Sequence, residues 1–295
     1  MTKEKKITNI GKTSLIVLGT VQDGGSPHIA CNKECCKDLF LQPDQNRLIV
    51  SIGIIDHENK KKYIFEATPN LIFQLKNLYI QSRFDNGELP DGIFITHAHV
   101  GHYSGLMYLG KEAMNSDNVN VYVMPKMKQF LENNGPWDQL VDIKNIHIKL
   151  LINNLNYNLT SNIKIMPFIV PHRNEYSETI GYIIEGTSKK ILFIPDIDKW
   201  DKDIIDLIYG IDYAFIDGTF YDVNEIDNRN ISEIPHPFIV DSMNLFKEMP
   251  VKEKNKIYFI HLNHTNPVLN PNSKQTNKVT KNGFNIARIN QIFEL

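Results

Sequence analysis

The sequence lacks several features that would place it in particular classes of protein. No run approaches about 18 consecutive apolar residues, so a transmembrane helix is not expected. The 32 basic and 34 acidic residues give a formal net charge of −2, which argues against nucleic acid as the partner. The basic start, residues 1–6, is not followed by the apolar core of a signal peptide. We therefore expect a cytoplasmic protein; nothing in the sequence indicates its oligomeric state.

Cysteine is scarce, and its placement is unusual. The only three cysteines, Cys31, Cys35 and Cys36, lie within six residues. An odd number packed this closely is a poor disulfide framework, and in a reducing compartment such a cluster more often binds metal. Three thiolates need one further ligand to complete a tetrahedral zinc site. The competing interpretation is a small buried cluster without metal.

The 295 residues are 42% hydrophobic, which is enough to bury a full core. Short apolar runs alternate with a few helical patterns along the chain, and no break divides it, so we expect one domain over residues 1–295. This pattern favours an α+β fold of two packed mixed sheets with helices outside. Polar, turn-rich loops are expected at 153–162 (with one weak hairpin), 222–237 and 270–282. Strands are predicted at 13–20, 46–55, 62–68, 92–96, 119–124, 146–152, 163–170, 180–185, 190–195, 211–217 and 256–261, and helices at 69–81, 104–115, 125–134, 200–209 and 238–248.

Three of the ten histidines, His97, His99 and His102, lie between the strand predicted at 92–96 and the helix predicted at 104–115. In an extended chain, residues i and i+2 project to the same side, so the first two can bind one ion together. His102 arrives from the first turn of the helix. Neutral imidazole is a common ligand of zinc and iron, so this density predicts a metal site. The alternative is three solvated loop histidines.

Further residues of ligand type follow apolar strands downstream. His172 follows the strand at 163–170, Asp196 follows the strand at 190–195, and His261 ends the strand at 256–261. Each alone would be unremarkable, because a histidine at a strand end is commonly structural and aspartate readily starts a turn. Their recurrence after the histidine cluster is what indicates a shared site.

This spacing resembles the metallo-β-lactamase superfamily, and the resemblance implies an αββα sandwich with metals in a cleft at one sheet edge. The implied metal ligands are His97, His99, His102, His172, Asp196 and His261. Residues 19–25, 96–106 and 261–267 resemble the PQQ-synthesis protein B group in particular. A related resemblance, to the cyclic phosphodiesterase of the carbon–phosphorus lyase pathway, implies a structural zinc on Cys31, Cys35, Cys36 and His264. His28 competes for the fourth place.

One position departs from the family pattern. Position 101 is glycine, whereas the family has an aspartate there that binds the second metal and orients water. Gly101 offers no side-chain ligand, which leaves three outcomes open. The protein holds one metal; or it holds two, with Asp198 or a water filling the gap; or it has lost catalysis.

The resemblance implies a hydrolase in which metal-activated water attacks a phosphoryl or carbonyl centre, with phosphodiesters as candidate substrates. One or two zinc ions are expected in the active site, with iron or manganese as alternatives. The alternatives in function are an iron-dependent oxygenase, as the PQQ-synthesis resemblance implies, and a non-catalytic metal or ligand binder.

The catalytic roles are predicted for two residues. Asp196 would bridge or orient, and His236 would protonate a leaving group or contact substrate, unless it is a surface loop residue. Asp217 is either a carboxylate that orients a histidine or a turn residue. Asp23, followed by two glycines after the first strand, is placed to approach the metal cleft.

Overall fold

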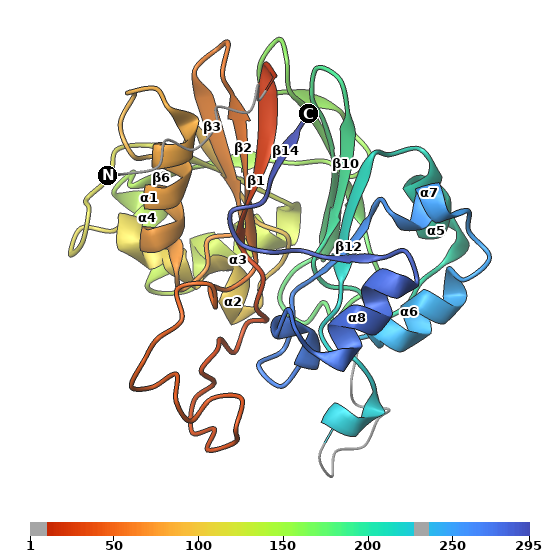
Figure 1. Cartoon of the computed structure of the whole chain (residues 1–295). Coiled ribbons are helices and arrows are strands. Elements are labelled where there is room, and N and C mark those ends of the chain that lie inside the picture. The colour runs from red at the N-terminus through yellow and green to blue at the C-terminus, as the bar shows by residue number, and fades with distance from the viewer. Residues whose placement is uncertain (1–10, 227–235) are drawn as a thin grey trace, which may run out of the picture.

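Two mixed sheets of seven strands face one another, and helices lie on their outer sides (Figure 1). The computed structural model describes residues 11–226 and 236–295. The strand order is β14-β1-β2-β3-β4-β5-β6 in the first sheet and β13-β12-β11-β10-β9-β8-β7 in the second. The predicted pair of packed mixed sheets with outer helices is thereby confirmed.

Each sheet combines antiparallel pairs at one side with three parallel pairs at the other, which run through β3-β4-β5-β6 in the first sheet and β10-β11-β12-β13 in the second. The first sheet comprises β1 (Thr13–Gly19), β2 (Ser51–Asp56), β3 (Lys61–Phe65), β4 (Gly92–Phe94), β5 (Val119–Val123), β6 (Ile146–Leu150) and β14 (Ile292–Glu294). The second comprises β7 (Tyr157–Asn158), β8 (Lys164–Ile169), β9 (Ile180–Glu185), β10 (Lys190–Ile194), β11 (Tyr213–Asp217), β12 (Ile257–Ile260) and β13 (Asn285–Ile286).

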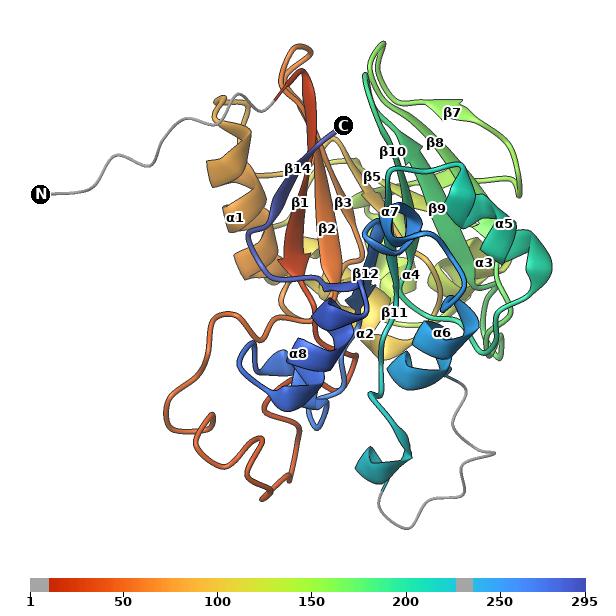
Figure 2. The same ribbon diagram turned by 45° about the vertical axis from the view of Figure 1, so that its right-hand side comes forward.

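Helices cover both outer faces, with α1 and α4 beside the first sheet and α5, α6 and α8 beside the second (Figures 1 and 2). The α-helices are α1 (Leu71–Ser82), α2 (Val100–Tyr103), α3 (Pro125–Asn133), α4 (Trp137–Asp142), α5 (Lys202–Tyr209), α6 (Ile239–Leu245), α7 (Val251–Lys254) and α8 (Lys274–Lys281). Short 3-10 turns are η1 (Ser104–Leu109), η2 (Val223–Glu225) and η4 (Pro267–Leu269).

The alternation of side chains along a strand explains why the strands read as continuous apolar runs. In β1, Leu15 and Val17 point into the layer between the sheets, while Ile16 and Leu18 point to the layer beneath the helices of the first sheet. In β10, Phe193 lies in the layer between the sheets. Because these strands are buried on both faces, apolar residues occupy both sets of positions.

The predicted strands and helices all overlap observed elements, but two predictions are corrected. The strand predicted at 46–55 begins only at Ser51. The helix predicted at 104–115 is wrong in form: α2 begins at Val100, and a 3-10 turn then ends at Leu109. Gly110 closes that turn, and Asn115 has a left-handed φ of 48°, so no regular helix continues.

The loop predicted at 270–282 is also wrong, since α8 occupies most of it. Ser273 caps this helix by accepting a hydrogen bond from the Thr276 amide, and only Thr276 and Val279 of the helix are buried. The weak hairpin predicted within 153–162 corresponds to β7, which pairs with β8. Of the loop predicted at 222–237, residues 227–235 lie outside the described residues. The elements α4, α7, β13 and β14 were not predicted.

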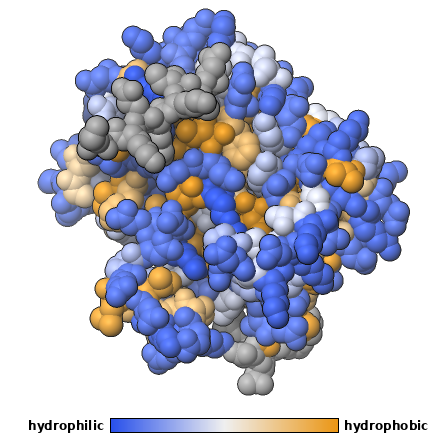
Figure 3. All heavy atoms as spheres, viewed as in Figure 1, coloured by the Kyte–Doolittle hydropathy of each residue, from blue (hydrophilic) through white to orange (hydrophobic). Residues whose placement is uncertain are grey.

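A long connection between β1 and β2, the β1–β2 segment (residues 20–50), projects from the end of the sandwich where α2 lies (Figures 1 and 2). Val21 holds its start by pairing with both Ile49 and Leu262. Its apolar side chains Ile29 and Leu41 are 81% and 87% exposed, and the segment shows apolar atoms at the lower left of Figure 3. None of the described helices is long and apolar enough to cross a membrane.

Candidate metal centre

Three histidines from different parts of the chain turn their ring nitrogens toward one point. His97 and His99 follow β4, and His172 follows β8. The His97 Nε2 lies 2.8 Å from His99 Nδ1, and His172 Nε2 lies 3.4 Å from the same atom. All three nitrogens lie within 4.8 Å of one another. Such a group fits the three protein ligands of a catalytic metal ion.

The opposite nitrogens of the same rings also have oxygen partners. The His172 Nδ1 lies 2.7 Å from Asp198 Oδ1, and His97 Nδ1 lies 2.8 Å from Thr96 Oγ1. Metal-binding histidines characteristically have such a partner, because it fixes the tautomer and the ring orientation. The contact with Asp198 aims the His172 Nε2 lone pair at the other two histidines.

A second group lies beside the first and contains two histidines and two aspartates. The Nε2 atoms of His102 and His261 lie 2.8 and 3.0 Å from Asp23 Oδ1. The same nitrogens lie 3.3 and 3.5 Å from Asp196 Oδ2. His261 has a left-handed φ of 62°, a strained backbone conformation that aims its ring into this group.

The outer nitrogen of His261 is hydrogen-bonded, whereas that of His102 faces a carboxylate without making a hydrogen bond. His102 Nδ1 lies 3.4 Å from the carboxylate of Glu66, which is fully buried. The His261 Nδ1 lies 2.8 Å from the Thr219 hydroxyl, and that hydroxyl donates its own hydrogen to Asp217. Thr219 therefore accepts from His261 Nδ1, which leaves the Nε2 lone pair directed at the two aspartates.

Asp196 connects the two groups. It follows β10, and its Oδ1 lies 3.8 Å from His172 Nε2 while its Oδ2 faces His102 and His261. The carboxylate is buried, and Oδ2 has no hydrogen-bond partner among the described residues. Burial raises the pKa of Asp196 to about 6 even though the neighbouring histidines oppose this. A buried carboxylate oxygen that makes no hydrogen bond, and contacts histidine nitrogens only at 3.3 and 3.5 Å, is poorly satisfied, so the arrangement fits a cation between the groups.

The pKa values of His97 and His172 are shifted in the opposite direction to that of His102. Burial lowers the pKa of His172 to about 2, and burial with the adjacent imidazoles lowers the pKa of His97 well below its ordinary value. Both are therefore in the neutral form that binds metal. Burial alone would lower the pKa of His102, but the carboxylates of Asp23, Glu66 and Asp196 raise it well above its ordinary value. A metal that binds there must displace a proton.

His236 lies beside these groups, with its side chain only 7% exposed. The His236 Nδ1 lies 2.7 Å from the Oδ2 of Asp217, which ends β11. Its ring centroid is 5.3 Å from that of His172 and 5.9 Å from that of His261. Although burial opposes it, Asp217 raises the pKa of His236 to about 9. His236 is thus not a surface loop residue, and Asp217 is the carboxylate that orients it.

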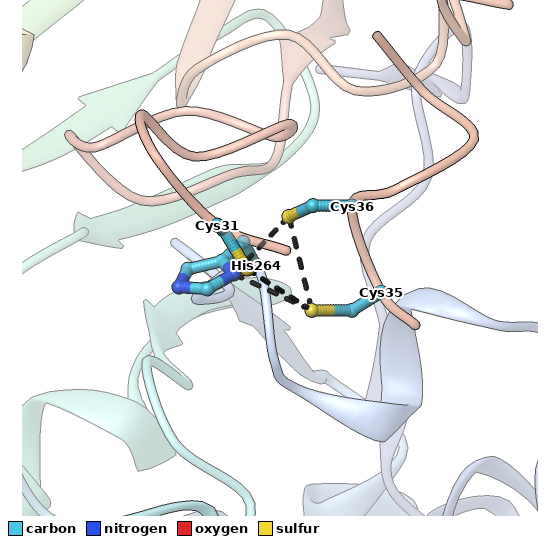
Figure 4. Close-up of side chains that lie close together, drawn as sticks. All are labelled: Cys31, Cys35, Cys36 and His264. Atoms are coloured by element: carbon cyan, nitrogen blue, oxygen red, sulfur yellow. Dashed lines mark hydrogen bonds between the residues drawn. The ribbon is translucent and has the colours of Figure 1, made fainter. Parts of the chain in front are cut away.

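The three cysteines and His264 form a separate cluster (Figure 4). The Cys35 Sγ lies 3.9 Å from Cys31 Sγ and 3.8 Å from Cys36 Sγ. The His264 Nδ1 lies 3.5 and 3.3 Å from the Sγ atoms of Cys35 and Cys36. The His28 ring instead stacks on His264 at a centroid distance of 4.6 Å, and its Nδ1 contacts the Ile29 carbonyl. His264, and not His28, therefore lies where a fourth ligand would have to be.

One residue that the sequence left open has another contact in the structure, and one residue of the site was not predicted. Asp198 was a candidate to fill the gap left at Gly101, but its carboxylate is engaged with His172 Nδ1. Glu66 was not predicted, although it follows the buried strand β3 as the other site residues follow theirs. Asp23 lies 74 or more residues from every histidine of the centre in sequence, and it was anticipated only as a residue that approaches the cleft.

Comparison with known families gives a match over most of the chain. The profile of the family described as "Beta-lactamase superfamily domain" matches residues 61–262. Coenzyme PQQ synthesis protein B of Acinetobacter baumannii (strain ACICU) is 23% identical over 92% of this chain and 97% of that protein.

Two solved structures extend this similarity to the fold. The Zn²⁺-bound PqqB from Methylobacterium extorquens has a TM-score of 0.80 at 19% identity, over 96% of this chain and all of that one. A diphosphatase from the PhnP family has a TM-score of 0.69 at 20% identity, over 96% of this chain and 97% of that one. At these sequence identities, the structural similarity shows the fold but does not identify the reaction.

Proposed function

Since the chain belongs to the metallo-β-lactamase superfamily, we propose that it is a metal-dependent hydrolase whose histidine–aspartate centre cleaves phosphate esters, phosphodiesters first among them. Zinc is the proposed metal, with iron or manganese as alternatives, and a separate zinc is proposed for the cysteine cluster. A small-molecule substrate and a cytoplasmic location are proposed with it.

The observation that carries this proposal is the position of Asp196. Its buried carboxylate lies between the histidine triad and the pair His102 and His261, with one oxygen directed to each side. Hydrolytic two-metal sites use a shared carboxylate of this kind to hold both ions beside one substrate. The buried Oδ2 makes no hydrogen bond to the described residues, which suits a ligand of a cation.

The residues of the chain have distinct parts in this reaction. His97, His99 and His172 would hold one ion, and Asp196 would bridge toward the second position. When bound, a metal ion polarises the phosphoryl oxygen and lowers the pKa of water toward neutrality. His236, whose Nδ1 is fixed on Asp217, would donate a proton from its other ring nitrogen to the leaving oxygen. Its own proton is then replaced from solvent.

Support for a phosphate substrate comes from two directions. The diphosphatase of the PhnP family shares this fold over nearly all of both chains. His236, the proposed proton donor, also lies beside a histidine of each group, His172 and His261. A proton donor next to bound metal suits the cleavage of a phosphoryl centre with an alkoxide leaving group.

The test is turnover by protein loaded with zinc, manganese or iron, measured on bis(p-nitrophenyl) phosphate, p-nitrophenyl phosphate, an aryl ester and a lactone. We expect diester hydrolysis, with His97→Ala reducing it ~1000-fold because the loss of several kcal/mol of metal-based stabilisation corresponds to that factor. His147→Ala, at an exposed histidine on β6, is the control and should retain full activity. Hydrolysis unaffected by His97→Ala would refute the proposal.

A second candidate is an iron-dependent oxygenase, favoured by the similarity to Coenzyme PQQ synthesis protein B over 92% of the chain. It predicts that iron-loaded protein consumes oxygen with a suitable organic substrate and hydrolyses none of the panel. If neither activity is found with any metal, the third interpretation, a metal or ligand binder without catalysis, gains support.

A further inference from the structure

Gly101 is glycine because another residue occupies the space that its side chain would need. A Cβ built on Gly101 would lie 2.6 Å from the Cα of Asp23, 2.7 Å from its Cβ and 2.8 Å from its Cγ. The backbone of Gly101 does not require glycine, because it lies in α2 and has no positive φ. The requirement is therefore for room, and Asp23 fills that room.

Asp23 brings a carboxylate to the place where the family pattern has lost one. Its Oδ1 lies 2.8 Å from His102 Nε2 and 3.0 Å from His261 Nε2. Asp23, His102 and His261 thus offer three ligand atoms within 4.8 Å of one another, and Asp196 Oδ2 lies 3.3 and 3.5 Å from the same two nitrogens. Asp196 Oδ2 makes no hydrogen bond and faces the same two nitrogens, so a cation held by Asp23, His102 and His261 would also lie beside Asp196.

The main chain holds Asp23 in this position. Gln22 donates its backbone N–H to the Leu262 carbonyl, and Leu262 donates to the Thr20 carbonyl. The stretch that carries Asp23 is thus hydrogen-bonded to the stretch that carries His261. On the other side of Asp23, Gly25 has a φ of +74° and donates to the Gln22 carbonyl, which closes a tight turn.

We propose that Asp23 supplies the carboxylate ligand of the second metal ion, in place of the family aspartate missing at position 101. The inference rests on the proposed metal centre but not on the identity of the reaction. Gly101 and Asp23 act as a pair: the carboxylate has moved from α2 to the β1–β2 segment, and the glycine gives it access.

Metal content tests this assignment independently of turnover. Full-length protein is loaded with Mn²⁺ or Zn²⁺ and desalted, and the metal bound per chain is measured by elemental analysis and by titration calorimetry. Asp23→Asn keeps the shape of the side chain but removes its charge. We expect it to lose the second ion of the histidine–aspartate centre, with binding weakened by ~100-fold or more, since even the partner of a ligand contributes 10- to 100-fold. In Mn²⁺-loaded protein, the spin-coupled two-ion EPR signal should give way to that of a single ion.

A second variant keeps the test decisive if Asp23→Asn folds poorly. Gly101→Ala adds no ligand and removes none, but its Cβ must displace Asp23, so it should lose the same ion. The matched controls are Gly210→Ala, whose added Cβ meets only the Leu207 carbonyl at 3.7 Å, and Asp38→Asn on the exposed part of the same segment. Both should keep every ion.

The possible results separate this inference from the proposed function. Full metal content and unchanged affinity in Asp23→Asn and Gly101→Ala would overturn the assignment of Asp23. Loss of one ion in both variants, with no phosphoester hydrolysis by wild-type protein, would support the assignment and defeat the proposed hydrolase.

Discussion

Replacing Cys36 by serine should remove one zinc ion and loosen the β1–β2 segment. The four ligand atoms already have the spacing of a metal site. Zinc–sulfur bonds of about 2.3 Å in a tetrahedron place sulfur atoms about 3.8 Å apart, and a zinc–nitrogen bond of about 2.0 Å places nitrogen about 3.5 Å from sulfur. The Cys35 Sγ lies 3.9 and 3.8 Å from the Sγ atoms of Cys31 and Cys36, and His264 Nδ1 lies 3.5 and 3.3 Å from those of Cys35 and Cys36.

The size of the effect follows from linkage. Free zinc at 1,000 times its dissociation constant stabilises the folded state by about 4 kcal/mol. At about 2 °C per kcal/mol for a chain of this size, Cys36→Ser should lower the Tm by roughly 8 °C if the segment unfolds together with the sheets. Burial and the adjacent thiols raise the pKa of Cys35 to about 12, so zinc binding should also release protons.

The assay combines elemental analysis, thermal unfolding and limited proteolysis. Cys36→Ser should contain one zinc fewer per chain and be cut within the β1–β2 segment, while Asn32→Ala, an exposed change between two of the cysteines, should behave as wild type. Undiminished zinc content in Cys36→Ser, with an unchanged Tm, would show that the cluster is only a group of packed thiols.

Two further predictions concern the support of the centre and the stability of the fold. Asp198→Asn should weaken metal binding about 10- to 100-fold without lowering the Tm of metal-free protein, because Asp198 orients the His172 ring and is not itself placed to bind metal; titration calorimetry measures this. Asp56→Asn should lower the free energy of unfolding by about 1–3 kcal/mol at pH 7, because the buried carboxylate accepts hydrogen bonds from Asn59, Thr160 and Asn162. These bonds lower the pKa of Asp56, so its contribution is present above the unfolded-state pKa and is lost as the pH falls through the folded-state pKa; urea unfolding from pH 7 down to pH 3 should show the two proteins converging.

The sheets could be predicted from the sequence because their strands carry their own signal. Runs such as Leu15–Leu18 are apolar at every position, since one face packs between the sheets and the other beneath helices. The helix α8 carries almost no such signal, because only Thr276 and Val279 of its eight residues are buried. The one local signal for this helix was Ser273, a residue type that commonly caps the N-terminus of a helix.

Some residues of the candidate site could also be predicted from the sequence, and others could not. His97, His99, His172, Asp196 and His261 could be proposed from sequence because each follows an apolar strand and strand ends of a sandwich meet at one edge. The contribution of Asp23 could not, because it depends on the path of the β1–β2 segment and on its pairing with the stretch after β12. The departure at Gly101 signalled that a carboxylate was needed, but no local pattern showed which one would supply it.

The most direct test of the central claim is an anomalous-scattering map of crystals grown with Mn²⁺ and Zn²⁺, with data collected on both sides of each absorption edge. The account predicts two metal peaks in the histidine–aspartate centre, separated by Asp196, with the second in contact with Asp23, and one zinc peak among Cys31, Cys35, Cys36 and His264. A single peak in the histidine–aspartate centre, with Asp23 still hydrogen-bonded to His102 and His261, would contradict it.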